Sequence, residues 1–356
     1  MKIYIVTQNF PPKIGGIQTV MFSIATYISL MGYEVSVFPD HWYLGEDNFK
    51  VKNIFSPKIF RQYIKRFFLN LGNHEETIII CDTWKSVNAI PKKFKNIVLF
   101  AHGQEYLKFK NKKRILSSLL RAKILITSSK YTLELIKNNW IISHLNSEVI
   151  YPTYHLKKQT IKNRPSKNVT KFISICRVEK RKGLLQSLIA LNKIQHKGYN
   201  FFWDIIGEGP QLNELKQKCY ELNLDKKVKF HGMIKSNEIK DDFLQNSDVF
   251  LMPAYQDEYS IEGFGLTYIE AASFGIPSVA GVFGGAPEAV INNKTGWCID
   301  PNNDEMIINI LEKTIVDKKE RKQFSKNALK RFEAELIGET AVKKLVNTIN
   351  QKFYTI

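Results

Sequence analysis

The sequence predicts an α/β protein of two doubly wound domains that face each other across a cleft. Short apolar runs alternate with segments of helical spacing from end to end, which is the pattern of β-α-β units and parallel sheets. Residues 156–170 are polar and basic without an apolar period, and they interrupt this alternation near its middle. At about 100–200 residues per domain, the 356 residues suffice for two such domains.

Six apolar runs in the first half have the length and composition of buried strands. The first two flank residues 17–31, whose apolar positions recur at helical spacing up to Gly32. A helix between two consecutive strands predicts that the strands are parallel. The six expected strands are 2–6, 34–38, 77–81, 97–101, 123–128 and 148–151.

The second half repeats the pattern after the linker. Its expected strands are 172–176, 201–206, 228–231 and 249–253. Its expected helices lie near 183–197, 210–222, 235–246, 265–274, 303–316 and 318–334, followed by a helical tail over 335–353. The first Rossmann-like domain should therefore cover residues 1–160, and the second residues 161–334.

Charge and cysteine usage narrow the class of protein. The net charge of +18 favours an anionic partner, which leaves open a phosphorylated small molecule, nucleic acid or an acidic membrane surface. The cysteines lie far apart, beside apolar runs and without metal-ligand spacing, so we expect buried thiols in a reducing compartment. They are Cys81, Cys176, Cys219 and Cys298. The sequence starts with a strand-like run and shows no signal peptide, and it has no apolar run of about 20 residues. We therefore expect a cytoplasmic protein.

The strongest chemical signal is the segment 261–275, IEGFGLTYIEAASFG. A glycine-flanked loop that runs into a helix lets backbone N–H groups approach a phosphate, and the helix dipole favours negative charge there. Glu262 and Glu270 would lie about 12 Å apart along a continuous helix, a span that brackets a sugar diphosphate and a ribose. In the alternative interpretation, Glu262 only complements the helix dipole and Glu270 faces solvent.

A second group of polar residues follows the expected strand 172–176, in the turn RVEKRKG. Arg177 and Lys182 lie there at a strand end, where cations would face a ligand. An arginine offers two parallel N–H donors to phosphate oxygens, and a lysine adds a point charge. The alternative is a solvated basic loop, which is the interpretation we favour for Lys180 and Arg181.

Loops after other strands carry weaker signals. Gly15 and Gly16 open a helix after the stiff turn NFPPKIGGI, a pattern suited to an anion, although it also occurs in ordinary turns. His102, in AHGQE, follows a strand and could donate to a substrate hydroxyl, although a lone histidine is usually structural. The loops 207–210 and 231–234 could cup a nucleobase through backbone contacts.

Several motifs are missing. The sequence has no GxxxxGK[ST] phosphate loop and no GxGxxG at its first helix, which argues against P-loop NTPases and ordinary dehydrogenases. It shows no clear cluster of Asp, Glu and His with metal-ligand spacing, so we expect no metal site.

Taken together, these motifs resemble those of the family-4 retaining glycosyltransferases, which have the GT-B fold. The motifs occur in order between residue 1 and about residue 300, and the wording of 252–290 is similar to that of GDP-mannose-dependent phosphatidylinositol mannoside mannosyltransferases. They are NFPPKIGGIQ, HGQE, RVEKRKG, GEGP, VKFHG, Glu262-x7-Glu270 and GGAPEAV.

The resemblance implies a role for each matching residue. Arg177 and Lys182 would bind the donor diphosphate, Glu262 the sugar hydroxyls and Glu270 the ribose. The other implied donor-binding residues are Gly15, Gly16, Gly207, Met233, Ile234, Gly263, Phe264, Gly265 and Leu266. His102 would line the catalytic cleft with the Gly15–Gly16 loop. The first domain would take the acceptor, the second the donor, and the terminal helix 335–356 would cross back onto the first domain.

The implied activity is retaining transfer of a hexose, with mannose from GDP-mannose as the first choice, to a lipid-linked or lipopolysaccharide/O-antigen-type acceptor in an α linkage. The implied reaction needs no metal and no cofactor, because cations and helix-end amides stabilise the departing diphosphate. A UDP-sugar donor is the alternative within the family. An epimerase or a glycosyl phosphorylase shares the two-domain architecture. Outside enzymes, a non-catalytic GT-B protein or a nucleic-acid-binding protein remains, although no nucleic-acid-reading module is present.

Residues 59–71 predict an amphipathic basic helix. It could lie on the anionic inner face of the cytoplasmic membrane, or its apolar side could pack on the sheet. A basic run at 108–114 follows it. Arg61, Lys65 and Arg66 lie off the apolar stripe. The stripe consists of Ile59, Phe60, Tyr63, Ile64, Phe67, Phe68 and Leu71.

Overall fold

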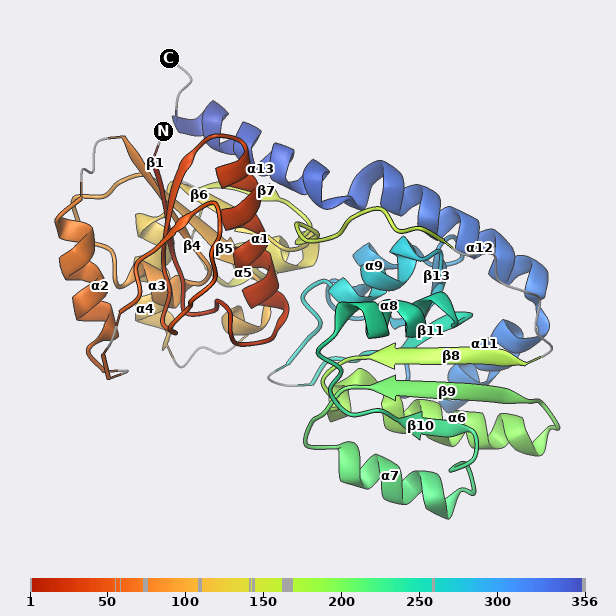
Figure 1. Ribbon diagram of the computed structural model, residues 1–356. Helices are drawn as coiled ribbons and strands as arrows, with labels where there is room; N and C mark the ends of the chain where they lie inside the picture. The colour runs from red at the N-terminus through yellow and green to blue at the C-terminus, as the bar shows by residue number, and fades with distance from the viewer. Residues whose placement is uncertain are drawn as a thin grey trace. The chain divides into compact units, whose positions relative to one another are not determined.

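The computed structural model describes residues 2–54, 56–57, 59–72, 76–107, 111–140, 142, 145–161, 169–257 and 260–353. The chain forms two compact units, each built on its own parallel sheet, so the α/β class is confirmed (Figure 1). Unit 1 combines Met1–Leu156 with the terminal segment Ile337–Ile356, and unit 2 is Lys157–Leu336. No helix of the described residues is long and apolar enough to cross a membrane.

Unit 1 has a seven-stranded parallel sheet in the order β3-β2-β1-β4-β5-β6-β7. Every residue of β4 and β5 is buried, as expected for strands with helices on both faces. The strand order reverses between β1 and β4, which is where open sheets of this kind bind ligands. The strands are β1 Lys2–Val6, β2 Glu34–Phe38, β3 Lys50–Val51, β4 Thr77–Cys81, β5 Ile97–Ala101, β6 Ile124–Thr127 and β7 Asn146–Val149.

The helices of unit 1 close both faces of its sheet, and the terminal helix α13 packs on α1 (Figure 1). The backbone N–H of Gly338, at the start of α13, donates to the carbonyl of Leu156 at 2.8 Å. The helices are α1 Gly16–Leu30, α2 Arg61–Asn70, α3 Trp84–Val87, α4 Lys112–Arg121, α5 Lys130–Asn139 and α13 Gly338–Phe353, with a 3-10 turn at Gln104–Tyr106.

Unit 2 has a six-stranded parallel sheet in the order β10-β9-β8-β11-β12-β13. This is the Rossmann order, with its reversal between β8 and β11. The strands are β8 Thr170–Ile175, β9 Phe201–Ile206, β10 Val228–Phe230, β11 Val249–Met252, β12 Ser278–Gly281 and β13 Gly296–Ile299.

In unit 2, α6 packs against α7 and α11, whereas α9 packs against α10 and α12. The core between these layers contains fully buried aromatic side chains, among them Phe172, Trp203 and Trp297. The helices are α6 Leu184–His196, α7 Leu212–Glu221, α8 Asn237–Gln245, α9 Leu266–Ser273, α10 Ala286–Ala289, α11 Asp304–Val316 and α12 Lys318–Arg331, followed by a π-helical turn at Phe332–Leu336.

Candidate functional site

A network of buried charges lies at the carboxyl end of the unit 2 sheet, between the loops that follow β8 and β11. Glu262 Oε2 accepts hydrogen bonds from Lys182 Nζ at 2.5 Å and from Arg181 Nη1 at 2.9 Å. Arg181 Nη2 lies 2.9 Å from Glu179 Oε1. The side chains of Lys182, Arg181 and Glu262 are only 9%, 10% and 14% exposed. Two carboxylates and two cations thus share one site that is largely shielded from water.

The charge of Glu262 is fixed by its partners. Burial raises the pKa of this carboxyl, but the charges and hydrogen bonds of Lys182 and Arg181 outweigh burial and lower the pKa to about 2. Glu262 is therefore ionised at neutral pH, with its second oxygen left to accept further hydrogen bonds. A sugar hydroxyl is a suitable donor for that oxygen.

Glycines allow this network to form. Gly183 has φ +69°, and a Cβ there would lie 2.2 Å from the carbonyl oxygen of Pro253, so the turn that carries Lys182 packs directly on the end of β11. Gly285 donates its N–H to the carbonyl of Glu262 at 2.8 Å, and a Cβ there would lie 2.1 Å from Gly263 O. The GGAPEAV motif therefore holds the backbone of Glu262 in place through this hydrogen bond and this close contact.

The amino end of α9 is adjacent to this network in sequence. α9 begins after Gly265, its first turn has no acidic residue, and no side chain of the described residues caps it. Its first N–H groups are therefore suited to an anion. Phe264 and Gly265 are buried, Gly263 and Leu266 half-buried, and Glu270 lies half-buried on the same helix.

Arg177 is exposed, whereas its neighbour in the same turn, Arg181, is buried. The side chain of Arg177 is 72% exposed, and its Nε lies 3.7 Å from Glu179 Oε2. The expectation that Arg181 is solvated is wrong, because it bridges Glu179 and Glu262. The physical reason is the 3-10 turn at Lys180–Lys182, in which consecutive side chains point about 120° apart. Lys180 faces solvent, while Arg181 and Lys182 turn inward.

The loops after β9 and β10 meet, as the nucleobase hypothesis requires. Gly207 N–H donates to the carbonyl of Gly232 at 2.7 Å. The next two residues are Met233, which is 50% exposed, and Ile234, which is half-buried. An apolar side chain and backbone groups are therefore available at this edge.

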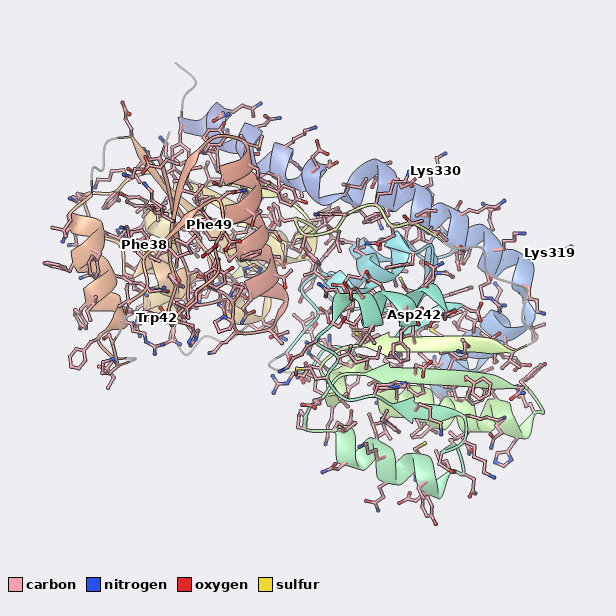
Figure 2. The ribbon with its side chains drawn as sticks, in the orientation of Figure 1. Phe38, Trp42, Phe49, Asp242, Lys319 and Lys330 are labelled. Carbon is pink, nitrogen blue, oxygen red and sulfur yellow. The ribbon has the colours of Figure 1, made fainter. Side chains whose placement is uncertain are left out.

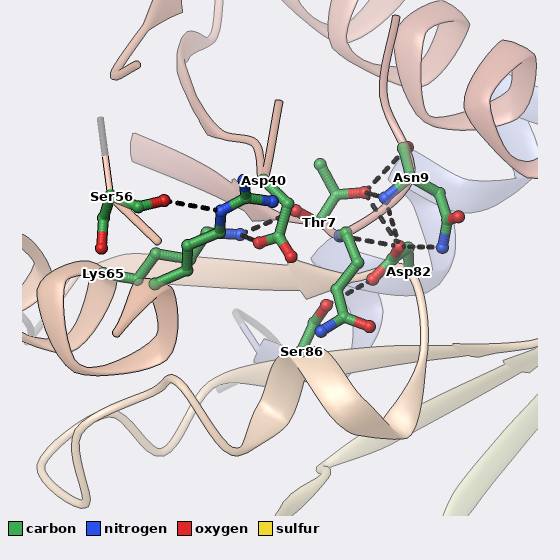
Figure 3. Close-up of polar contacts among 9 residues, drawn as sticks. Thr7, Asn9, Asp40, Ser56, Lys65, Asp82 and Ser86 are labelled. Atoms are coloured by element: carbon green, nitrogen blue, oxygen red, sulfur yellow. Dashed lines mark hydrogen bonds and ion pairs between the residues drawn. The ribbon is translucent and has the colours of Figure 1, made fainter. Parts of the chain in front are cut away.

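Unit 1 contains a polar hub that the sequence analysis missed (Figure 3). Asp82, fully buried after β4, accepts from Asn9 Nδ2 at 2.8 Å, from Thr7 Oγ1 at 2.9 Å and from Ser86 Oγ at 2.5 Å. The backbone N–H groups of Gln8 and Asn9 donate to the same carboxylate at 3.0 and 3.1 Å. The hub holds the start of the NFPPKIGGI loop against the end of β4, at the point where the strand order reverses.

One predicted residue, His102, is hydrogen-bonded to this hub. His102 Nε2 donates to the carbonyl of Asp82 at 2.9 Å, and its backbone N–H donates to Glu105 Oε1 at 2.7 Å. Gly15 and Gly16 start α1, whose first turn has no acidic residue. The signal that could have revealed Asp82 is its place directly after a predicted strand.

The expected amphipathic helix exists as α2, but it packs differently from an ordinary surface helix. The alternative in which the apolar stripe packs on the sheet is wrong, because Tyr63 and Phe67 are 68% and 62% exposed. The helix instead buries Leu69 and Lys65. Lys65 Nζ pairs with Asp40 and donates to the carbonyl of Thr7 at 2.8 Å, so its charge is compensated inside unit 1.

Two further expectations concern metals and basic residues. Nowhere in the part of the chain that the structure describes do three His, Cys, Asp or Glu side chains gather as they would around a metal ion. Of the basic run 108–114, residues 108–110 lie outside the described residues.

Residues 157–331 match the model of the family Glycosyl transferases group 1. This range coincides almost entirely with unit 2, so the similarity to that family lies in unit 2.

The chain is also similar to curated relatives over part of their length. It is 33% identical over 133 residues to the putative colanic acid biosynthesis glycosyltransferase WcaL of Escherichia coli K12, covering 37% of this chain and 32% of that protein. It is 29% identical over 148 residues to the GDP-mannose-dependent alpha-(1-6)-phosphatidylinositol monomannoside mannosyltransferase of Mycobacterium tuberculosis, covering 41% and 38%. The matches thus span about a third of these relatives.

Solved structures match the whole fold. The Anabaena protein HepE in complex with UDP and glucose superposes with a TM-score of 0.75 at 20% identity, over 99% of this chain and 100% of that one. The lipopolysaccharide outer core galactosyltransferase WaaB has the same TM-score at 18% identity, with the same coverage. These likenesses establish the glycosyltransferase (GT-B) fold for the chain.

Proposed function

We propose that the protein is a retaining hexosyltransferase that moves mannose from GDP-mannose, in an α linkage, to a lipid-linked or lipopolysaccharide/O-antigen-type acceptor. The observation that carries this proposal is the buried Lys182–Glu262 pair beside the amino end of α9, within a group 1 glycosyltransferase domain. The mannosyltransferase named above supports GDP-mannose as the donor, and WcaL and WaaB support a glycan or lipopolysaccharide acceptor.

The proposed reaction assigns separate work to each residue. Lys182, Arg177 and the N–H groups at the start of α9 stabilise the negative charge that develops on the departing diphosphate. Glu262 accepts from the sugar hydroxyls and Glu270 from the ribose. The bond from the anomeric carbon to the phosphate oxygen breaks while the bond to the acceptor oxygen forms on the same face, and the acceptor proton passes to the leaving phosphate. His102 takes part in catalysis, and Gly15 and Gly16 bind the donor.

A UDP-hexose is the second candidate donor. HepE, a structural neighbour over the whole chain, was solved with UDP and glucose, which is the observation that favours it. The difference between the two donors lies in the base that Gly207, Met233 and Ile234 would contact.

A thermal-shift panel tests the donor directly. Purified protein is heated with GDP, UDP, ADP or CMP, with magnesium or with EDTA. A nucleotide at 100 times its Kd stabilises the native state by about 2.7 kcal/mol, which raises the melting temperature by several degrees. We expect a shift with GDP that EDTA leaves unchanged. A shift with UDP alone replaces the donor, a shift that EDTA abolishes refutes the metal-free reaction, and no shift with any nucleotide supports a non-catalytic protein.

We also propose that the protein is cytoplasmic and binds peripherally to the inner face of the cytoplasmic membrane through α2. The exposed stripe of this helix supports the proposal, because large apolar side chains on a lone surface helix favour an interface. Tyr63→Ser with Phe67→Ser should weaken sedimentation with phosphatidylglycerol vesicles by about tenfold or more. Tyr220→Ser with Ile239→Ser, at equally exposed positions of unit 2, is the control. Equal vesicle binding by wild type and both variants would sink the proposal.

A further inference from the structure

Three basic side chains gather at the carboxyl end of the unit 1 sheet, near the point where the strand order reverses. Lys13 belongs to the loop after β1, His41 to the loop after β2, and Arg61 is the first residue of α2. Lys65, one helical turn after Arg61, donates to Thr7 at the end of β1 and pairs with Asp40 beside His41. Lys65 therefore holds the first turn of α2 against the loops that carry the other two groups.

The charge of this cluster is not compensated. Burial lowers the pKa of His41 first, and the charges of Lys13 and Arg61 lower it next, so both cations act on the imidazole ring. Asp40 opposes them, but Lys65 already neutralises it. Arg61 donates from Nε to the carbonyl of Ser56 at 3.1 Å, and its two terminal nitrogens have no hydrogen-bond partner in the described structure. Lys13 is exposed, and the described residues offer no partner for it or for the His41 ring.

A large apolar side chain adjoins each of these basic residues. Ile14 follows Lys13 and is 67% exposed, Trp42 follows His41 and is 51% exposed, and Phe60 precedes Arg61 and is 56% exposed. Trp42 lies beyond the carboxyl end of β2 (Figure 2). The cluster is thus an arrangement of cations bordered by apolar surface, which suits an anion that carries an apolar chain.

Contacts of the neighbouring Tyr43 hold the loop that carries His41 and Trp42 in place. The ring of Tyr43 packs edge-on against Phe10 with centroids 5.4 Å apart. Asn53 accepts from Tyr43 N–H at 2.9 Å and donates to Tyr43 O at 2.7 Å. Phe10 belongs to the same loop as Lys13, so one aromatic cluster positions both loops before any ligand binds.

We propose that Lys13, His41 and Arg61 bind the phosphate or pyrophosphate group of an amphiphilic molecule whose apolar chain lies on Ile14, Trp42 and Phe60. The guanidinium supplies two parallel donors to phosphate oxygens, the lysine a point charge and the imidazole one further donor. That this amphiphile is the sugar acceptor rests on the proposed function, whereas its binding does not.

Isothermal titration of the full chain, without any nucleotide sugar, tests the site. The probes are farnesyl phosphate, farnesol and inorganic phosphate. We expect farnesyl phosphate to bind at least about tenfold more tightly than either of the other two, and Lys13→Gln with Arg61→Gln to weaken it by about tenfold or more. Lys92→Gln with Lys95→Gln, which removes two exposed lysines before β5, should change the affinity less than twofold. The ring resonances of His41 should shift with farnesyl phosphate and not with farnesol.

Three other results would overturn the proposal, each in a different way. Equal affinity of wild type and the Lys13/Arg61 variant shows that farnesyl phosphate binds elsewhere. Phosphate that binds as tightly as farnesyl phosphate shows a site for a free anion. If farnesyl phosphate does not bind but the variant loses affinity for phosphatidylglycerol vesicles, the cluster only contacts a bilayer surface. Farnesyl phosphate binding without any nucleotide-induced thermal shift would keep this site while refuting the proposed transferase.

Discussion

Replacing Lys182 with methionine should lower the rate of sugar transfer at saturating donor by about 10²–10³-fold. Lys182 Nζ is the buried cation closest to Glu262, and a fixed donor that stabilises charge in a transition state contributes about 2.7–4 kcal/mol. Methionine keeps the length and volume of the side chain, and Arg181 continues to compensate Glu262. The free energy of unfolding should therefore change much less than the activation free energy.

A matched control is available in the same turn. Lys180 is exposed and precedes Lys182 by two residues, so Lys180→Met removes one positive charge without touching Glu262. Its kcat should stay within about twofold of the wild type. If Lys180→Met and Lys182→Met lose the same activity, the effect comes from the overall charge of the loop, and Lys182 has no special role.

The sheet strands were predictable because parallel strands with helices on both faces are apolar throughout. β4 and β5 are uninterrupted runs of buried residues, and both have the bounds that the sequence predicts. The shortest elements could not be predicted from the sequence. β3 has two residues and α3 has four, so neither repeats its period often enough to be recognised.

Helices of intermediate length were also missed. α4 and α5 have ten residues each and follow directly on strands or turns, and neither was predicted from the sequence. In unit 2, β12, β13 and α10 were missed as well. β12 and β13 contain Gly281 and Gly296, and α10 follows Gly285; these glycines lower strand and helix propensity, but the structure needs them for close backbone contacts.

The sequence predicted which loops form the candidate site, but not which side chains contact one another there. Lys182 and Glu262 are 80 positions apart, so only the β8–β11 adjacency of the sheet brings them together. The direction of Arg181 depends on a 3-10 turn, which a basic sequence such as KRK does not reveal. The same holds for Lys65, which was predicted to lie off the apolar stripe of an amphipathic helix but is buried in contact with Asp40 and Thr7.

Asp82 concentrates more hydrogen bonds on one side chain than any of the residues predicted from the sequence, so its loss should be costly for unit 1. Asp82→Ala removes five hydrogen bonds and leaves the Ser86 hydroxyl, the Gln8 N–H and the Asn9 side-chain amide without this acceptor, while the Thr7 hydroxyl can still donate to Asn9 O and the Asn9 N–H to Thr7 Oγ1. Unsatisfied buried donors cost about 1–3 kcal/mol each where water cannot replace the partner. Since water can enter the vacated space, we expect a total loss of about 4 kcal/mol and a melting temperature lower by about 10 °C.

Graded variants separate the hub from a general surface effect. Ser86→Ala removes one of these hydrogen bonds and should cost about 1 kcal/mol, while Glu46→Ala, at an exposed position of the same unit, should change stability by less than about 0.5 kcal/mol. Urea unfolding followed by tryptophan fluorescence gives all three values, because Trp84 lies buried two residues after Asp82. Asp82→Ala as stable as Glu46→Ala would contradict the hub, since five hydrogen bonds would then contribute nothing to the native state. If the variants lose stability in the expected order, the Asp82 carboxylate is the group that fixes the NFPPKIGGI loop to β4. It then also fixes the position of the Gly15–Gly16 turn at the start of α1.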